Sequence, residues 1–200
     1  MSPSTSSRRS LVLNFLIFIC LLLGAKGVKV VSQETLSIGA IPDQNPEHLN
    51  RLYKLLSSSL SRKLNVPVRY IPVTNYPAAV SAFRTGSLDL AWFGGLTGTQ
   101  ARIQKPGSIV LAQRDIDSKF QSVFIANQSS KIPIIKKQSE LSTLKNKRFT
   151  FGSESSTSGR LMPQHYLQAA GVNMNDFKDG RPGFSGSHDA TIALVQSGSY

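Results

Sequence analysis

The chain has 200 residues, of which 40% are hydrophobic and 17% are charged. This composition supplies enough apolar side chains for a packed core and excludes a chain that is disordered over most of its length. The formal net charge of +12 is compatible with nucleic acid, an acidic surface or small anions as partners. Because the basic residues are scattered and aromatic residues are not interleaved with them, we do not expect nucleic-acid binding.

The N-terminus has the pattern of an export signal. A basic pair, Arg8-Arg9, precedes an apolar run over residues 11–25, and small residues follow. This order is typical of a secretory signal peptide, and the run is shorter than the roughly 20 residues that a membrane span needs. The two arginines fit a twin-arginine signal only weakly. We therefore expect residues 1–27 to be a signal peptide and the remaining chain to be periplasmic.

The chain has a single cysteine, Cys20, which falls inside the expected signal peptide. A lipid anchor requires a small residue just before the cysteine, and Ile19 occupies that position, so we do not expect lipidation. The exported chain would then contain no disulfide, and its stability must come from its core. The three histidines, His48, His165 and His188, are far apart in the sequence, so we expect no metal site, and we expect no cofactor.

Strands and helices are predicted to alternate in the first part of the chain. The predicted strands are 36–41, 66–73 and 88–93, and the predicted helices between them are 46–64 and 76–85. A strand–helix–strand alternation favours a parallel sheet in an α/β unit. A further strand is predicted at 109–113.

A second α/β unit is predicted after the first. Its expected elements are an extended segment at 118–126, a polar turn at 131–139, a short helix at 141–147, a strand at 148–151, a helix at 161–170, a strand that ends at Phe184 and a helix at 190–196. The expected organisation is a first lobe over 28–115, a crossing over 116–121 and a second lobe over 122–200.

Residues 152–159, GSESSTSG, lie between a predicted strand and a predicted helix. The first N–H groups of a helix have no intrahelical partner and carry partial positive charge, so a small anion can bind there. Glycine allows a close approach of the backbone, and the Ser and Thr hydroxyls add donors. A plain N-cap with a serine-rich loop is the alternative interpretation. The spacing is not that of a P-loop, so a nucleoside triphosphate is not expected.

Three other segments are candidates for the same site. Ser187-His188-Asp189 precedes a helix, where His188 could donate a hydrogen bond to an anion or simply belong to a helix cap. Adjacent Ser, His and Asp cannot form a catalytic triad, because neighbouring side chains point apart. Tyr76 and the Phe93-Gly94 pair lie at the carboxyl ends of predicted strands, where α/β proteins bind ligands, although core packing is the favoured explanation for each of them taken alone.

Several long segments together resemble one family. The segments are IPDQNPEHLNRLY, PVTNYPAAVSAFRTGSLDLAWFGGLTGTQAR, AQRDIDSKFQSVFIAN, RFTFGSESSTSGRLMPQHYL and GFSGSHDATIALVQSGSY. They resemble the phosphate, phosphite and phosphonate substrate-binding proteins of ABC transporters, in particular a cyanobacterial-type branch described as selenate- or phosphonate-binding. The resemblance covers nearly all of residues 34–200.

The resemblance implies a type II periplasmic-binding-protein fold, in which two α/β lobes close on a ligand by a hinge motion. It implies that Ser155, Ser156, Thr157 and Ser158 hold the oxyanion, together with Tyr76, Phe93, Gly94 and His188. Family members continue beyond the point that corresponds to residue 200. The resemblance therefore implies that lobe one lacks its C-terminal part here, together with acidic ligand-binding residues.

The function expected from this resemblance is capture of a tetrahedral oxyanion (phosphonate, phosphite or phosphate) and its delivery to a membrane permease with its ATPase. No catalytic residue is expected. The alternatives are a sensory or interaction module of the same fold and a serine/histidine hydrolase, for which no GxSxG motif or paired carboxylates are present. The sequence does not distinguish among the oxyanions, because hydroxyl and N–H donors accept all of them.

Overall fold

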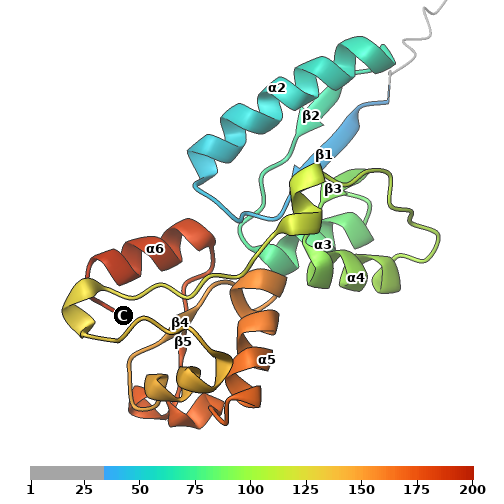
Figure 1. Ribbon diagram of the computed structural model, residues 1–200. Coiled ribbons are helices and arrows are strands. Elements are labelled where there is room, and N and C mark those ends of the chain that lie inside the picture. Colours follow the sequence, from blue (N-terminus) through green and yellow to red (C-terminus); the bar gives the residue numbers. More distant parts are fainter. Residues whose placement is uncertain (1–33) are drawn as a thin grey trace, which may run out of the picture. The chain divides into compact units, whose positions relative to one another are not determined.

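The computed structural model describes residues 34–200, which form one compact unit, so the expected signal peptide lies outside the described residues. The N-terminal half, residues 34–105, contains a parallel sheet of order β2-β1-β3 (Figure 1). Its strands are β1 (Leu36–Ala40), β2 (Val68–Tyr70) and β3 (Leu90–Trp92). The predicted parallel sheet is thus confirmed, with the second and third strands shorter than expected.

Three helices accompany this sheet: α2 (Pro46–Leu64), α3 (Tyr76–Arg84) and α4 (Gly95–Gln104). Helix α2 begins where the side chain of Asn45 accepts hydrogen bonds from the N–H groups of Glu47 and His48. It ends at Asn65, whose left-handed backbone (φ 53°) stops the helix. A proline near the start of α2 and of α3 fits the first helical turn, where its missing N–H costs nothing.

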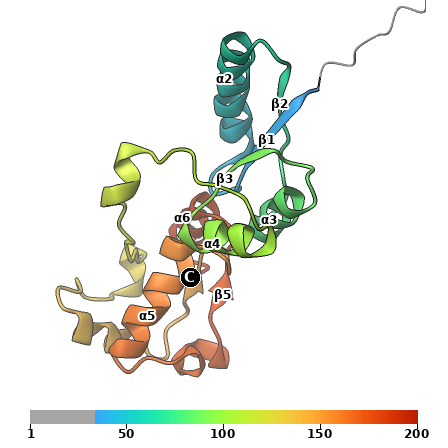
Figure 2. The ribbon, with the colours of Figure 1, turned by 90° about the vertical axis from the view of Figure 1, so that its right-hand side faces the viewer.

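The C-terminal half, residues 120–200, has a two-stranded parallel sheet of β4 (Thr150–Phe151) and β5 (Gly183–Phe184). Helices α5 (Met162–Ala169) and α6 (His188–Gln196) follow these strands (Figure 2). The core of this half is a single apolar cluster. It comprises Leu141, Leu144, Phe151, Leu167, Val172 and Phe177. In the N-terminal half a smaller cluster of Ala40, Leu49 and Tyr53 joins α2 to the sheet.

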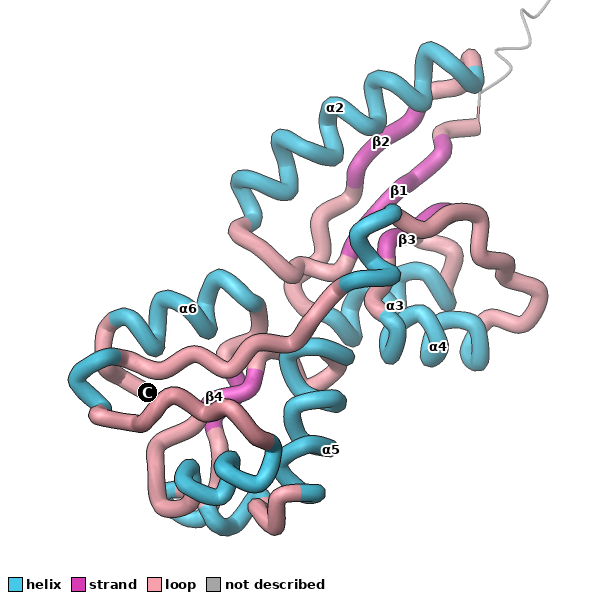
Figure 3. The backbone as a smooth tube through the Cα atoms, in the orientation of Figure 1, coloured by secondary structure: helices cyan, strands magenta, loops and turns pink. Residues whose placement is uncertain are grey.

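Three sequence predictions need correction. The strand predicted at 109–113 is absent, and Figure 3 shows this segment as loop. The helix predicted at 141–147 is a 3₁₀ turn at Gln138–Leu144. Helix α4 was not predicted, because Gly95 and Gly98 lower its helix propensity and no side chain caps its start. The chain between α4 and β4 is loop with short helical turns, one of which, Asp115–Lys119, occupies the expected crossing.

No helix within residues 34–200 is both long and apolar enough to cross a membrane.

Candidate functional site

The hydroxyl-rich loop is a folded turn and not a linker. The N–H of Gly152 donates to the carbonyl of Gly159 at 2.9 Å and closes the loop at its base. A Cβ atom at Gly152 would lie 3.4 Å from Gly159 Cα, so the two glycines permit a close approach of the two ends of the loop. The chain then makes one turn of π-helix, Thr157–Leu161, directly before α5. Ser156 caps this turn, because its Oγ accepts from Gly159 N at 2.9 Å.

Ser156 is also in contact with Tyr76. The Tyr76 side chain is 2% exposed and lies at the first position of α3, whose N-cap is Asn75. Burial, together with the negative charge of Asp43, raises the pKa of Tyr76 to about 12, although a hydrogen bond with the Ser156 side chain acts in the opposite direction. The phenol is therefore a neutral hydroxyl at pH 7, able to donate a hydrogen bond beside Ser156.

Thr157 connects the loop to the N-terminal half. Its Oγ1 accepts a hydrogen bond of 2.7 Å from the N–H of Leu96, in the first turn of α4. A Cβ atom at Gly95 would lie 3.2 Å from Thr157 Oγ1, and one at Gly94 would lie 3.9 Å away. The positive end of α4 and the start of the π-helical turn thus face each other across Thr157. The threonine hydroxyl has accepted one hydrogen bond and still has its own proton to donate.

His188 begins α6 and contacts the other half through its backbone. Its N–H donates to the carbonyl of Asp43 at 3.0 Å, and the carboxylate of the next residue, Asp189, accepts from Asn45 N at 2.7 Å. Ser187 caps the helix by accepting from Ala190 N. The predicted helix start is therefore confirmed, and the His188 side chain lies near Asp43, since its positive charge lowers the pKa of that carboxyl.

Asp43 is a residue of the site region that the sequence reasoning missed. Burial raises its pKa, whereas a hydrogen bond to its own backbone and the positive charges of His188 and Arg114 lower it. Its charge also acts on Tyr76, so it lies near both Tyr76 and His188. The signal in the sequence was its position in the loop that follows β1, beyond the carboxyl end of the central strand.

The structure brings some of the predicted site residues together and places others apart. Tyr76, Ser156, Thr157 and Gly94 are linked by the contacts above. Within the loop, Ser155 is half-buried and its N–H donates to Ser153 Oγ. The carbonyl of Ser158 accepts a hydrogen bond of 2.9 Å from Ser122 Oγ. Phe93 packs edge-to-face on Phe83, with ring centroids 5.6 Å apart. Within residues 34–200, the ring of Phe93 thus packs against α3.

This arrangement is suited to binding an anion. The hydroxyls of Tyr76, Ser156 and Thr157 are neutral donors, and the starts of two helical segments add N–H groups with partial positive charge. A tetrahedral oxyanion takes hydrogen bonds from several directions, which donors from both halves of the chain can supply. Fold and site together define a structural class: an α/β protein of two halves with a donor-lined site, suited to a small anion, where the halves meet.

The family is given by comparison with known proteins. Residues 38–200 match the model of the ABC-transporter phosphonate periplasmic substrate-binding proteins, and the chain belongs to this family. It is 55% identical over 187 residues to the probable ABC transporter phosphite binding protein PhnD1 of Prochlorococcus marinus (strain MIT 9301). It is 28% identical over 150 residues to the phosphonates-binding periplasmic protein of Escherichia coli (strain K12). The resemblance seen in the sequence is thereby confirmed.

A solved structure supports the fold assignment. The structure of PhnD1 from Prochlorococcus marinus (MIT 9301) in complex with methylphosphonate superposes with a TM-score of 0.81 at 59% identity, over 82% of this chain and 61% of that one. A binding protein of a Pseudomonas aeruginosa phosphonate transporter gives 0.66 at 24% identity, over 82% of this chain and 54% of that one. The expected type II periplasmic-binding-protein fold is confirmed.

The chain spans only part of these relatives. The match to the Prochlorococcus marinus protein covers 93% of this chain and 63% of the relative, and the match to the Escherichia coli protein covers 73% and 44%. More than a third of each relative's length therefore lies outside the match.

Proposed function

We propose that the chain is the periplasmic solute-binding component of an ABC transporter and that it captures a small tetrahedral oxyanion of the phosphonate or phosphite type. The observation that carries this proposal is the glycine-closed hydroxyl loop 152–159, which faces Tyr76 and the start of α4. The Prochlorococcus marinus relative is named as a phosphite-binding protein, and its structure holds methylphosphonate.

The physical basis of capture is hydrogen bonding and not covalent chemistry. Closure of the two halves on the anion excludes water, and the lower local dielectric strengthens each hydrogen bond to the charged oxygens. Residues 1–27 carry three of the positive charges (Arg8, Arg9 and Lys26) and no acidic residue, so a net charge of about +9 remains on the exported chain; it attracts anions and increases their rate of encounter. In this proposal the site residues are those predicted from the sequence: Tyr76, Phe93, Gly94, Ser155, Ser156, Thr157, Ser158 and His188. The partners of the loaded protein are the permease and ATPase subunits of the transporter.

Calorimetric titration of the protein with methylphosphonate, phosphite, phosphate and sulfate tests the proposal. We expect binding of at least one phosphorus oxyanion, and Tyr76→Phe should weaken it roughly 10-fold or more, because hydrogen bonds to charged groups contribute about 1.5–3 kcal/mol. Tyr166→Phe is the matched control, since Tyr166 is an exposed tyrosine on α5. No heat from any of these anions with a folded protein, or equal losses in the two variants, would contradict the proposal.

A further inference from the structure

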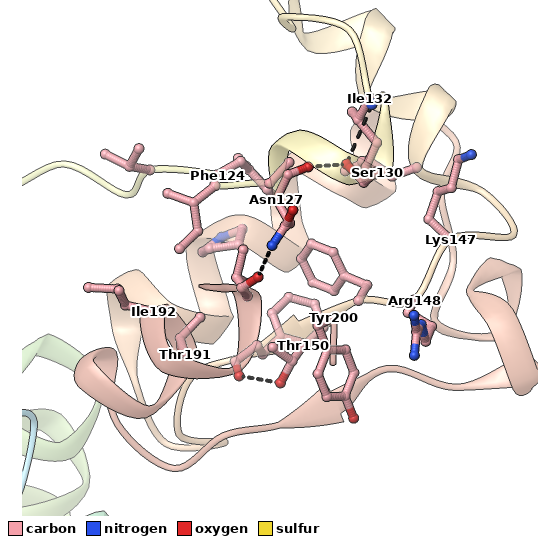
Figure 4. A pocket seen from close by; sticks show the side chains of 18 of the residues that line it. Phe124, Asn127, Ser130, Ile132, Lys147, Arg148, Thr150, Thr191, Ile192 and Tyr200 are labelled. Atoms are coloured by element: carbon pink, nitrogen blue, oxygen red, sulfur yellow. Dashed lines mark hydrogen bonds between the residues drawn. The ribbon is translucent and has the colours of Figure 1, made fainter. Parts of the chain in front are cut away.

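The C-terminal half contains a groove of about 1080 Å³ beside its small sheet. Figure 4 shows Asn127 on one side of this groove and Tyr200 on the other, and the groove extends to Ser158 and His188 at the candidate anion site. None of the described residues that line it is acidic, whereas basic residues such as Lys147 are present. A carboxylate that acts on a bound anion therefore has to come from outside the groove.

Asp43 brings a carboxylate to the site from the N-terminal half. It lies in the loop that follows β1, and this loop runs past the hydroxyl loop: a Cβ atom at Gly94 would lie 3.6 Å from Ile41 Cδ1 and 3.9 Å from Thr157 Oγ1. Two residues after Ile41, the carbonyl of Asp43 accepts from His188 N at 3.0 Å. Asp43 is therefore held between two of the segments that build the site.

The carboxylate of Asp43 is not paired with another residue. It is half-buried, and the hydrogen bond that acts on it comes from its own backbone, with no donor from elsewhere in residues 34–200. The other nearby carboxylates differ, because Asp189 accepts from Asn45 N at 2.7 Å and Glu154 of the hydroxyl loop is exposed. A half-buried carboxylate that has lost part of its hydration without a new donor favours a ligand that supplies one.

Three phenol groups lie near this carboxylate. Burial raises the pKa values of Tyr53, Tyr70 and Tyr76, and the negative charge of Asp43 acts in the same direction on each of them. None of the three hydroxyls donates to Asp43 in the described part of the chain. The acceptor positions of the carboxylate are thus open to a donor on a bound anion. The other charged groups that act on it are His188, Arg114 and Asp189.

We infer that Asp43 sets the selectivity of the site, by accepting a hydrogen bond from an oxygen of the anion that still carries its proton. The inference rests on the proposed function. At pH 7 phosphate and the monoanion of methylphosphonate carry such a P–OH group, whereas sulfate has no proton to donate. A protonated anion gains a charge-assisted hydrogen bond with Asp43, and sulfate instead meets a carboxylate of like charge that stays unpaired.

The donors of the site do not make this distinction. The hydroxyls of Tyr76 and Thr157 and the N–H groups at the helix starts bind the ionised oxygens of a phosphonate and of sulfate alike. An ionised carboxylate only accepts hydrogen bonds, so Asp43 responds to the presence of a proton on the anion.

The test is the ratio of the affinities for methylphosphonate and sulfate, measured by calorimetric titration at pH 7. The parent protein should prefer methylphosphonate. Asp43→Asn replaces the carboxylate by a neutral amide of the same size, which can donate to sulfate. The ratio should fall about 10-fold or more, because the protonated anion loses a charge-assisted hydrogen bond and sulfate loses a repulsion. Circular dichroism verifies that the variant is folded.

Asp189→Asn is the matched control, because it also removes one negative charge next to His188, from a carboxylate that is already engaged by Asn45 N. Its ratio should stay close to that of the parent, even where both affinities fall. An unchanged ratio in Asp43→Asn, equal falls in the two variants, or a parent protein that binds sulfate as tightly as methylphosphonate would each overturn this inference alone. Absence of binding of every anion by the parent protein would overturn the proposed function and the inference together.

Discussion

Burial raises the pKa of both Tyr76 and Asp43, with opposite consequences at neutral pH. For Tyr76 the raised pKa keeps the phenol in the neutral form that donates a hydrogen bond, so it has no cost in stability at neutral pH. For Asp43 burial penalises the ionised carboxylate, and a backbone hydrogen bond together with the electrostatic influence of His188 and Arg114 offsets only part of that penalty. A carboxyl with a raised pKa, here beside the candidate anion site, therefore costs the folded state stability at neutral pH.

Replacement of Asp43 by asparagine tests this cost. Because the folded-state pKa lies above the unfolded value of about 3.9, the folded state binds more protons between the two values, and stability falls as the pH rises through that window. Asp43→Asn removes the penalty, so its midpoint of thermal unfolding at pH 7 should exceed that of the parent. The gain should shrink as the pH falls toward about 4. A loss of stability at pH 7 would show that the attraction to His188 and Arg114 outweighs the desolvation.

At the scale of elements, α4 provides the contact between the loop and the N-terminal half through a backbone N–H. Leu96 is in the first turn of the helix, where its N–H has no intrahelical acceptor and is free to bond Thr157. Proline is tolerated in that turn, so Leu96→Pro removes the donor without breaking the helix. Leu96→Ala is the control, because it also removes the side chain but keeps the N–H.

We expect Leu96→Pro to bind methylphosphonate about five-fold more weakly than Leu96→Ala, since a neutral hydrogen bond contributes about 1 kcal/mol. Calorimetric titration of both variants measures the ratio, and circular dichroism shows whether each keeps its helix content. Identical affinities in two folded variants would mean that the bond between Thr157 and Leu96 does not orient the loop for binding.

The sequence predicted those elements whose ends carry strong local signals. Pro46 and Glu47 mark the start of α2, and the strand before Gly152 leads into the hydroxyl loop as expected. The prediction failed where local signals were weak or misleading. Helix α4 begins at a glycine with no side-chain cap, and Ile109 and Val110 have a strand-like pattern without a neighbouring strand to pair with.

The candidate site was predictable only in part, for a related reason. Ser156 and Thr157 stand in one motif, so their proximity follows from the sequence. The approach of Tyr76, Asp43 and the Leu96 N–H to that motif depends on long-range packing between the halves, which no local pattern encodes. Phe93 was predicted as a site residue because it follows β3, yet its ring packs against Phe83.

At the scale of the whole described unit, hydrogen bonds connect the two halves at the hydroxyl loop, where Ser156 also bonds Tyr76, and at the start of α6. At the loop, Thr157 Oγ1 accepts a hydrogen bond from Leu96 N. At the start of α6, His188 N donates to the carbonyl of Asp43, and Asp189 Oδ2 accepts from Asn45 N. In a protein that closes on its ligand, bonds between halves stabilise the closed state, and the apparent affinity rises with the population of that state.

Asp189→Ala removes the charge-assisted bond to Asn45 and should weaken anion binding about five-fold, mainly through faster dissociation. Glu47→Ala is a closely matched control, because Glu47 is also an acidic residue in the first turn of a helix, and its side chain bonds Arg51 of the same helix at 2.7 Å. Both variants lose one negative charge and one favourable interaction with a helix N-terminus, so the net charge of the protein and the electrostatics of a helix start change alike. Stopped-flow dissociation of methylphosphonate separates them: a faster release in Asp189→Ala alone assigns the effect to the contact between the halves, and equal rates refute it.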